Sequence, residues 1–159
     1  MKKCIFCKFY KNNQNIVYKN KFFYIRFDDF PVSPGHLEII PVRHVVSFFD
    51  LTSSEWRQLK PTINKAINII KKTNFKNLYK TLSENNSRKL NKKFYKKILK
   101  RKEINKKPSG YNIGVNEGKV AGRTINHLHI HIIPRYFGDV KDCVGGIRCV
   151  IPGMKNYKR

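Results

Sequence analysis

Three histidines at alternate positions constrain this chain more than any other feature. The segment reads His127-Leu128-His129-Ile130-His131-Ile132-Ile133-Pro134. Its apolar residues favour an extended backbone, and a strand sends alternate side chains to opposite faces. We therefore predict a strand whose three imidazoles share one face, with the apolar residues in the core behind them. We expect Pro134 to end the strand, because proline has no N–H to donate to a neighbouring strand. A polar, solvent-facing strand and a metal site made of all three histidines are the alternatives.

The length of 159 residues suits one domain with a hydrophobic core, so we expect residues 1–159 to form a single domain. No apolar run reaches the ~18 residues that a membrane-spanning helix needs. The N-terminus becomes polar by Lys8, which leaves no room for the apolar core of a signal peptide. These features predict a cytoplasmic protein with no membrane span.

The order of the predicted elements indicates an α+β domain. Five strands are expected, at residues 16–18, 22–27, 37–41, 111–115 and 125–132. Thr52 and Glu55 have the spacing of a capping box, and apolar residues at helical spacing continue from there to about Lys72. Strands followed by one long helix and then by more strands are typical of a mainly antiparallel sheet with a helix packed on it.

Positive charge is concentrated in one segment. The net charge is +24, and residues 88–107 hold 11 basic residues and one acid, so they carry +10 of it. Such charge favours polyanionic partners. However, the excess is mostly lysine accompanied by Asn and Ile, as AT-rich codon usage produces. We therefore favour compositional drift over dedicated nucleic-acid binding.

Within this basic segment, Leu90, Phe94 and Ile98 recur every four residues between lysines, with Tyr95 and Leu99 alongside, which predicts a basic amphipathic helix. One interpretation is an arm that binds RNA or a membrane surface. The other, which we favour, is a solvated insertion whose apolar stripe docks on the domain. On that interpretation the segment has no part in placing the catalytic residues.

The histidine segment resembles the signature of the histidine triad (HIT) family of nucleotide hydrolases and transferases, His-φ-His-φ-His-φ-φ with φ apolar. Residues 27–36, 116–124 and the tail after Pro134 extend the resemblance to bacterial-type members that hydrolyse diadenosine polyphosphates. It implies the HIT fold: a mainly antiparallel five-stranded sheet with one long helix and a shorter one. It also implies a homodimer. Members usually lack the stretch at about 80–108, which is therefore a basic helical insertion.

The resemblance assigns catalytic roles to the triad. His129 attacks the α-phosphorus and forms a nucleotidyl-histidine that water resolves, while a backbone carbonyl holds its other ring nitrogen as N–H. His131 contacts the phosphate and assists proton transfer, and His127 supports the group from behind. A neutral imidazole suits this chemistry because it is nucleophilic near pH 7 and leaves readily from phosphorus.

The resemblance also implies a nucleotide-binding set. Asp28 matches the acidic residue that binds the ribose hydroxyls, and Asn116 and Thr124 match the phosphate-contacting amide and hydroxyl. Gly122 lets backbone N–H groups approach a phosphate. Arg123 stands where many members have Gln, and it is either a fixed cation beside the phosphates or a surface arginine.

Three further expectations concern the surroundings of the nucleotide. Asp28 is preferred to its neighbour Asp29 because the spacing Asp-x-x-Pro ends at Pro31. His36 is expected to be structural and to pack under the edge of the sheet. The apolar candidates for a base pocket are Phe6, Phe9, Ile25 and Phe27.

Cys4 and Cys7 have the spacing of a zinc knuckle, in which two thiolates bind one metal ion. Some bacterial members of the family have zinc ligands that match these cysteines together with His44 and His127. The resemblance thus implies a structural zinc and no organic cofactor. The alternative is two free thiols and a surface His44.

These features together predict an enzyme, a nucleotidyl hydrolase that cleaves adenine nucleotides such as diadenosine polyphosphates at the α-phosphate. A nucleotidyltransferase or phosphorylase would use the same covalent intermediate with a different acceptor. The non-enzyme alternative is a nucleotide- or RNA-binding module that depends on the basic insertion.

Overall fold

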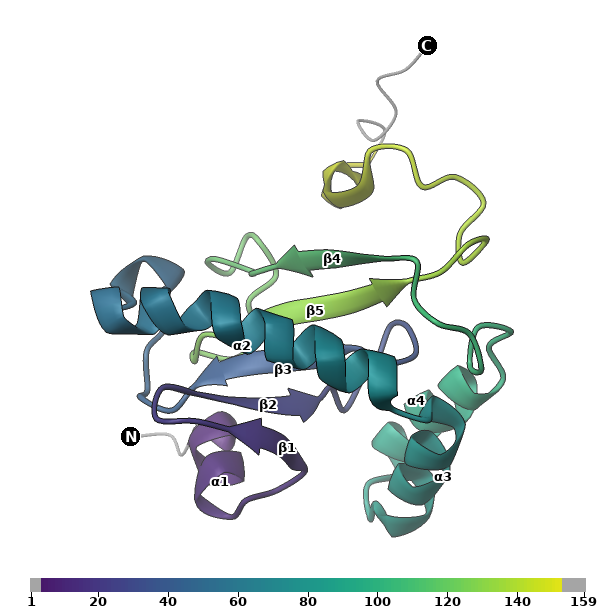
Figure 1. Ribbon diagram of the computed structural model, residues 1–159, viewed down its shortest axis with the longest axis horizontal. Helices are drawn as coiled ribbons and strands as arrows, with labels where there is room; N and C mark the ends of the chain where they lie inside the picture. The colour runs from purple at the N-terminus through teal and green to yellow at the C-terminus, as the bar shows by residue number, and fades with distance from the viewer. Residues whose placement is uncertain (1–3, 153–159) are drawn as a thin grey trace.

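A computed structural model describes residues 4–152 and shows one antiparallel sheet with helices on both faces (Figure 1). The strands are β1 (Ile16–Lys19), β2 (Phe23–Phe27), β3 (Leu37–Pro41), β4 (Gly110–Gly114) and β5 (Ile130–Arg135), and the α-helices are α1 (Ile5–Lys11), α2 (Ser53–Lys72), α3 (Phe75–Asn85) and α4 (Lys89–Leu99). Two 3-10 helices, Phe48–Asp50 and Gly146–Val150, complete the set. The strand order is β1-β2-β3-β5-β4, and every pair is antiparallel. The predicted α+β class is confirmed.

The two faces of the sheet are covered by different helices. The long helix α2 crosses one face, whereas α1 lies against the other (Figure 1). Strand β2 contributes side chains to the cores on both faces of the sheet. Ile25 packs in the core on the α2 side, and Tyr24 packs with Phe6 and Phe9 of α1. None of the helices within residues 4–152 is long and apolar enough to cross a membrane.

The predicted capping box starts α2. The Thr52 hydroxyl accepts a hydrogen bond from the Glu55 N–H at 3.2 Å, and the Glu55 carboxylate accepts one from the Thr52 N–H at 2.7 Å. These two bonds satisfy backbone donors that a helix start otherwise leaves unpaired. The helix then continues through Pro61 to Lys72, where the sequence predicted its end.

The triad strand differs from the prediction at both ends. Strand β5 begins at Ile130, so His127 and His129 precede it, and it continues through Pro134 to Arg135. The pairing of β5 with β3 reaches only Ile132, so Pro134 lies where the strand has β4 as its one neighbour. A missing N–H costs little there, which explains why Pro134 does not end the strand. The predicted alternation holds, because the apolar residues between the histidines are buried in the core on the α2 side.

The basic insertion forms the helix pair α3–α4, which packs at one end of the sheet (Figure 1). Docking on the domain is confirmed, because Tyr95 and Ile98 belong to the main core. Of the predicted apolar stripe, Tyr95 and Ile98 are buried and Leu99 packs against the core, whereas Leu90 is 55% exposed and Phe94 is half-buried. The Tyr95 hydroxyl donates to Asp29 at 3.1 Å.

Two residues, Tyr79 just before the insertion and Tyr95 within it, contact the loop between β2 and β3, whereas the expectation that residues 88–107 are dispensable for chemistry stays a prediction. The Tyr79 hydroxyl on α3 accepts a hydrogen bond from the Gly35 N–H at 2.9 Å, and Tyr95 holds Asp29. Gly35 has a positive φ of 83°, and the Phe75 ring fills the space that a Cβ there would need. The loop between β2 and β3, which carries Asp28 and His36, therefore rests on α3 and α4.

We expect Tyr79→Phe to lower the free energy of unfolding by about 1–3 kcal/mol, because it leaves the buried Gly35 N–H without an acceptor. Thermal and urea unfolding would measure the loss. Tyr10→Phe is the matched control, because Tyr10 packs beside Tyr24 at the edge of the α1 cluster. Equal stability of the two variants would contradict a supporting role for Tyr79.

Candidate active site and metal centre

His129 packs against Phe6 of α1, and its ring is oriented by a backbone carbonyl. Its Nδ1 is 2.8 Å from the carbonyl oxygen of His127. A carbonyl only accepts, so Nδ1 carries the proton and Nε2 keeps its lone pair. The Phe6 ring packs against the imidazole with centroids 5.1 Å apart, and His129 is 8% exposed. This arrangement presents one nucleophilic nitrogen on a restrained ring.

His131 is part of a buried polar chain with His36 and Asp28. Its Nδ1 lies 3.0 Å from His36 Nε2, and His36 Nδ1 lies 3.3 Å from Asp28 Oδ2. Burial, followed by the neighbouring His36 and His129, lowers the pKa of His131 to about 4. His131 is therefore neutral at pH 7 and one of its nitrogens is tied to His36.

The expectation for His36 needs correction. It is buried as predicted, but its ring joins Asp28 to His131 instead of packing only under the sheet edge. No local sequence pattern indicates this contact, because residues 36 and 131 meet only through the pairing of β3 with β5, in which Glu38 lies opposite His131.

Asp28 and Asp29 have different partners. Asp29 Oδ1 accepts hydrogen bonds from Arg26 at 2.8 Å and from Tyr95 at 3.1 Å. This carboxylate therefore binds the insertion through Tyr95. Asp28 Oδ1 accepts from the Phe30 N–H, and its other oxygen faces the histidines. Asp28 is thus the carboxylate that borders the triad.

The loop at residues 116–124 follows β4 and leads into the triad. Gly122 has a φ of 93°, and the Asn116 side-chain amide lies 3.7 Å from the position of a Cβ at Gly122. Thr124 is exposed. These three residues leave polar groups and an open backbone at one edge of the site.

Arg123 is not the surface arginine that one of its two interpretations proposed, and its role beside the phosphates stays a prediction. Its guanidinium donates to Glu117 at 3.1 Å and to the Val46 carbonyl at 3.2 Å, and the second Glu117 oxygen accepts from the Phe48 N–H. The side chain is only 17% exposed. Arg123 therefore anchors the loop at 116–124 to the segment before α2, and Glu117 offsets its charge.

The four apolar candidates for a base pocket lie on opposite faces of the sheet. Ile25 and Phe27 are buried in the core on the α2 side, whereas Phe6 and Phe9 pack on the α1 side with the triad. The alternation along β2 separates them, since residues 25 and 27 share the face opposite residue 24.

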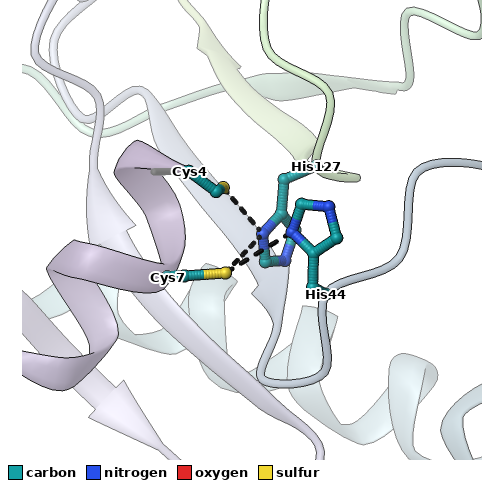
Figure 2. Close-up of side chains that lie close together, drawn as sticks. All are labelled: Cys4, Cys7, His44 and His127. Carbon is teal, nitrogen blue, oxygen red and sulfur yellow. Dashed lines mark hydrogen bonds between the residues drawn. The ribbon is translucent and has the colours of Figure 1, made fainter. Parts of the chain in front are cut away.

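Beside the triad, Cys4, Cys7, His44 and His127 bring four ligand atoms together, all within 4.8 Å of one another (Figure 2). The Sγ of Cys4 and that of Cys7 lie 3.3 and 3.6 Å from His127 Nδ1, and Cys7 Sγ lies 3.4 Å from His44 Nδ1. In a tetrahedral zinc site, bond lengths of about 2.3 Å to sulfur and 2.0 Å to nitrogen separate those atoms by about 3.5 Å. The donor set and its spacing fit a tetrahedral metal ion.

The surroundings of this group support the same reading. His127 Nε2 lies 2.9 Å from the Pro41 carbonyl oxygen, so Nε2 carries the proton and Nδ1 points its lone pair at the thiols. Burial lowers the pKa of His127 to about 4, which keeps the ring neutral. Burial and the adjacent Cys4 raise the pKa of the Cys7 thiol to about 11, and a bound cation reverses that effect. His127 thus connects the metal group to the triad.

The HIT domain family model matches residues 10–138. The chain belongs to the HIT family. Solved HIT structures share its fold: a HIT family protein from Bacillus anthracis has a TM-score of 0.59 and 26% identity, covering 85% of this chain and 74% of that one. A zinc-bound histidine triad protein from Mycobacterium smegmatis has a TM-score of 0.56 and 23% identity, covering 86% and 78%, and shows the same fold.

Among curated relatives, an AP-4-A phosphorylase from Mycobacterium tuberculosis is 27% identical over 147 residues, which is 91% of this chain and 59% of the relative. An uncharacterised HIT-like protein from Methanocaldococcus jannaschii is 28% identical and covers 86% and 81%. An asymmetrical bis(5'-nucleosyl)-tetraphosphatase from Schizosaccharomyces pombe is 30% identical and covers 70% and 44%. This HIT protein thus spans about half the length of these two relatives with enzymatic names.

Proposed function

We propose that this HIT protein hydrolyses adenine dinucleotides, such as diadenosine polyphosphates, at the α-phosphorus through a nucleotidyl-histidine at His129. The observation that carries the proposal is the hydrogen bond of His129 Nδ1 to the His127 carbonyl. It holds the ring in the tautomer whose Nε2 attacks, and it does so before any substrate arrives. Restraint of this kind removes part of the entropy cost of the reaction.

The reaction has two displacements. In the first, His129 Nε2 forms a bond to the α-phosphorus, the bond from phosphorus to the leaving phosphate oxygen breaks, and that oxygen leaves as an anion, to which the ring N–H of neutral His131 donates a hydrogen bond. In the second, water attacks phosphorus and gives a proton to solvent, and the phosphorus–nitrogen bond breaks to release AMP and neutral His129. The proximity of His131 to His129, with ring centroids 5.0 Å apart, supports this division of roles.

For nucleotide binding we propose Asp28 at the ribose hydroxyls, with Asn116, Thr124 and the backbone around Gly122 at the phosphates. Asp28 borders the triad, and the open backbone at Gly122 suits a close approach of an anion. Arg123, which is tied to Glu117, acts on the nucleotide through the loop that it anchors.

A phosphorylase is the second candidate, because the mycobacterial relative carries that name. Phosphate would then replace water in the second displacement, and the product would be ADP instead of AMP. Product analysis with purified protein, with and without added phosphate, separates the two reactions. A release of AMP that is independent of phosphate is expected.

We further propose that Cys4, Cys7, His44 and His127 hold a structural zinc ion. The donor spacing and the Pro41 carbonyl behind His127 support it, and a reducing cytoplasm would keep both thiols available. When bound, the ion would fix the backbone at His127, whose carbonyl orients His129.

We expect His129→Ala to lower turnover by at least about three orders of magnitude, because it removes the nucleophile. The affinity for AMP should stay within a few-fold, since binding is assigned to Asp28, Asn116 and Thr124. Steady-state assays on diadenosine tetraphosphate and calorimetry with AMP would measure the two effects. Retention of a tenth of the wild-type turnover would refute the assignment.

The protein should contain about one zinc ion per chain, and Cys4→Ser/Cys7→Ser should lose both the ion and stability, because metal binding contributes to folding free energy. Elemental analysis and thermal unfolding are the measurements. Cys143→Ser/Cys149→Ser is the matched control, since both of those thiols are exposed and outside the group. Metal-replete wild-type protein without zinc would contradict the proposal.

A homodimer is proposed from the free edge of the sheet. Within residues 4–152, strand β4 pairs only with β5, and Ile113 on it is 38% exposed. An unpaired edge strand with an apolar side chain is readily buried by a second copy across a two-fold axis. Light scattering at micromolar concentration should give the mass of a dimer, and the mass of a monomer would count against it.

A further inference from the structure

The outward face of α4 is a row of lysines. Its members are Lys89, Lys92, Lys93, Lys96, Lys97 and Lys100, and together they line a surface groove of about 530 Å³. Spacings of three and four residues place all six on one side of the helix. The opposite side holds Tyr95 and Ile98, which are buried in the core. The lysine row is therefore fixed on the domain by the packing of its own helix.

This row is costly for a helix. Like charges three or four residues apart destabilise a helix, and residues 89–100 contain no acid to offset them. No ion pair within residues 4–152 involves these lysines. The lysines of α2, at 60, 65, 71 and 72, also fall on one side of their helix, but they are four in 20 residues, against six in residues 89–100. The density of positive charge therefore distinguishes α4 from α2.

An apolar edge flanks the lysine row. Leu90 is 55% exposed, and the half-buried Phe94 meets Phe30 edge-to-face with ring centroids 5.3 Å apart. Phe30 is 42% exposed, and its N–H donates to Asp28 at the border of the triad. Aromatic surface thus continues from the lysine row to the loop that carries Asp28.

We propose that α4 binds single-stranded nucleic acid, with its lysines on the phosphates and Phe94 and Phe30 as a stacking surface for bases. A basic track beside exposed aromatic rings is the arrangement that such strands recognise. A membrane is disfavoured because a helix that enters a lipid surface needs a free apolar face, and that face of α4 is buried in the domain. The proposal is independent of the hydrolase activity.

The salt dependence of binding tests the lysine row directly. The probe is a fluorescein-labelled oligothymidylate of about 16 nucleotides, followed by anisotropy between about 50 and 200 mM salt. Each phosphate contact contributes about −0.7 to the slope of log K against log salt, so six contacts predict a slope near −4. Lys93→Gln/Lys96→Gln/Lys97→Gln should flatten that slope by about 2. Lys60→Gln/Lys71→Gln/Lys72→Gln on α2, with the same change in net charge, should leave it nearly unchanged.

The stacking surface has its own test. Phe94→Ala should weaken binding about tenfold with the slope unchanged, and Phe94→Leu should also weaken it, because stacking needs an aromatic face. Equal losses in the two lysine triple variants would show a general charge effect and overturn the proposal. Binding to a duplex of the same length, or to phosphatidylserine vesicles, as tight as to the single strand would overturn the assigned partner.

Discussion

His127 is the residue on which both parts of the site depend. Its ring Nδ1 faces the two thiols, its Nε2 is held by the Pro41 carbonyl, and its own carbonyl orients His129. One residue therefore couples the metal group to the proposed nucleophile. A shift of its backbone would disturb both the donor set and the tautomer of His129. This coupling explains why an ion that takes no part in the chemistry would still matter for it.

The insertion has a second role in the architecture. Helices α3 and α4 hold the loop between β2 and β3 through Tyr79 and Tyr95, and that loop carries Asp28 and His36 into contact with His131. The outward face of α4 carries the lysine row defined above. The helix pair thus contacts the loop that carries Asp28 on one side, and on its other side it carries the lysine row proposed to bind nucleic acid.

Features that depend on neighbouring residues were predictable from the sequence. The capping box at Thr52 and Glu55 and the bounds of β3 were confirmed, because local hydrogen bonds and strand periodicity set them. The orientation of His129 was implied by the family resemblance, and its hydrogen bond is present. The site roles themselves stay predictions.

Features that depend on distant contacts were not predictable. His36 meets His131 only after β3 pairs with β5, and Arg123 finds Glu117 and Val46 only when its loop closes on the segment before α2. The contact of Tyr95 on α4 with Asp29 joins residues 66 positions apart, which no local pattern shows. Pro134 was misjudged because its cost depends on which side of the strand has a neighbour.

The stereochemical course at phosphorus tests the central claim most directly. Hydrolysis of a diadenosine polyphosphate with a chiral α-phosphorothioate in ¹⁸O-water yields ¹⁸O-labelled adenosine 5'-phosphorothioate, whose configuration at phosphorus records the number of displacements. Attack by His129 followed by attack by water inverts the centre twice, so the account predicts net retention. Net inversion would mean that water attacks the substrate directly, and it would contradict a covalent intermediate on His129.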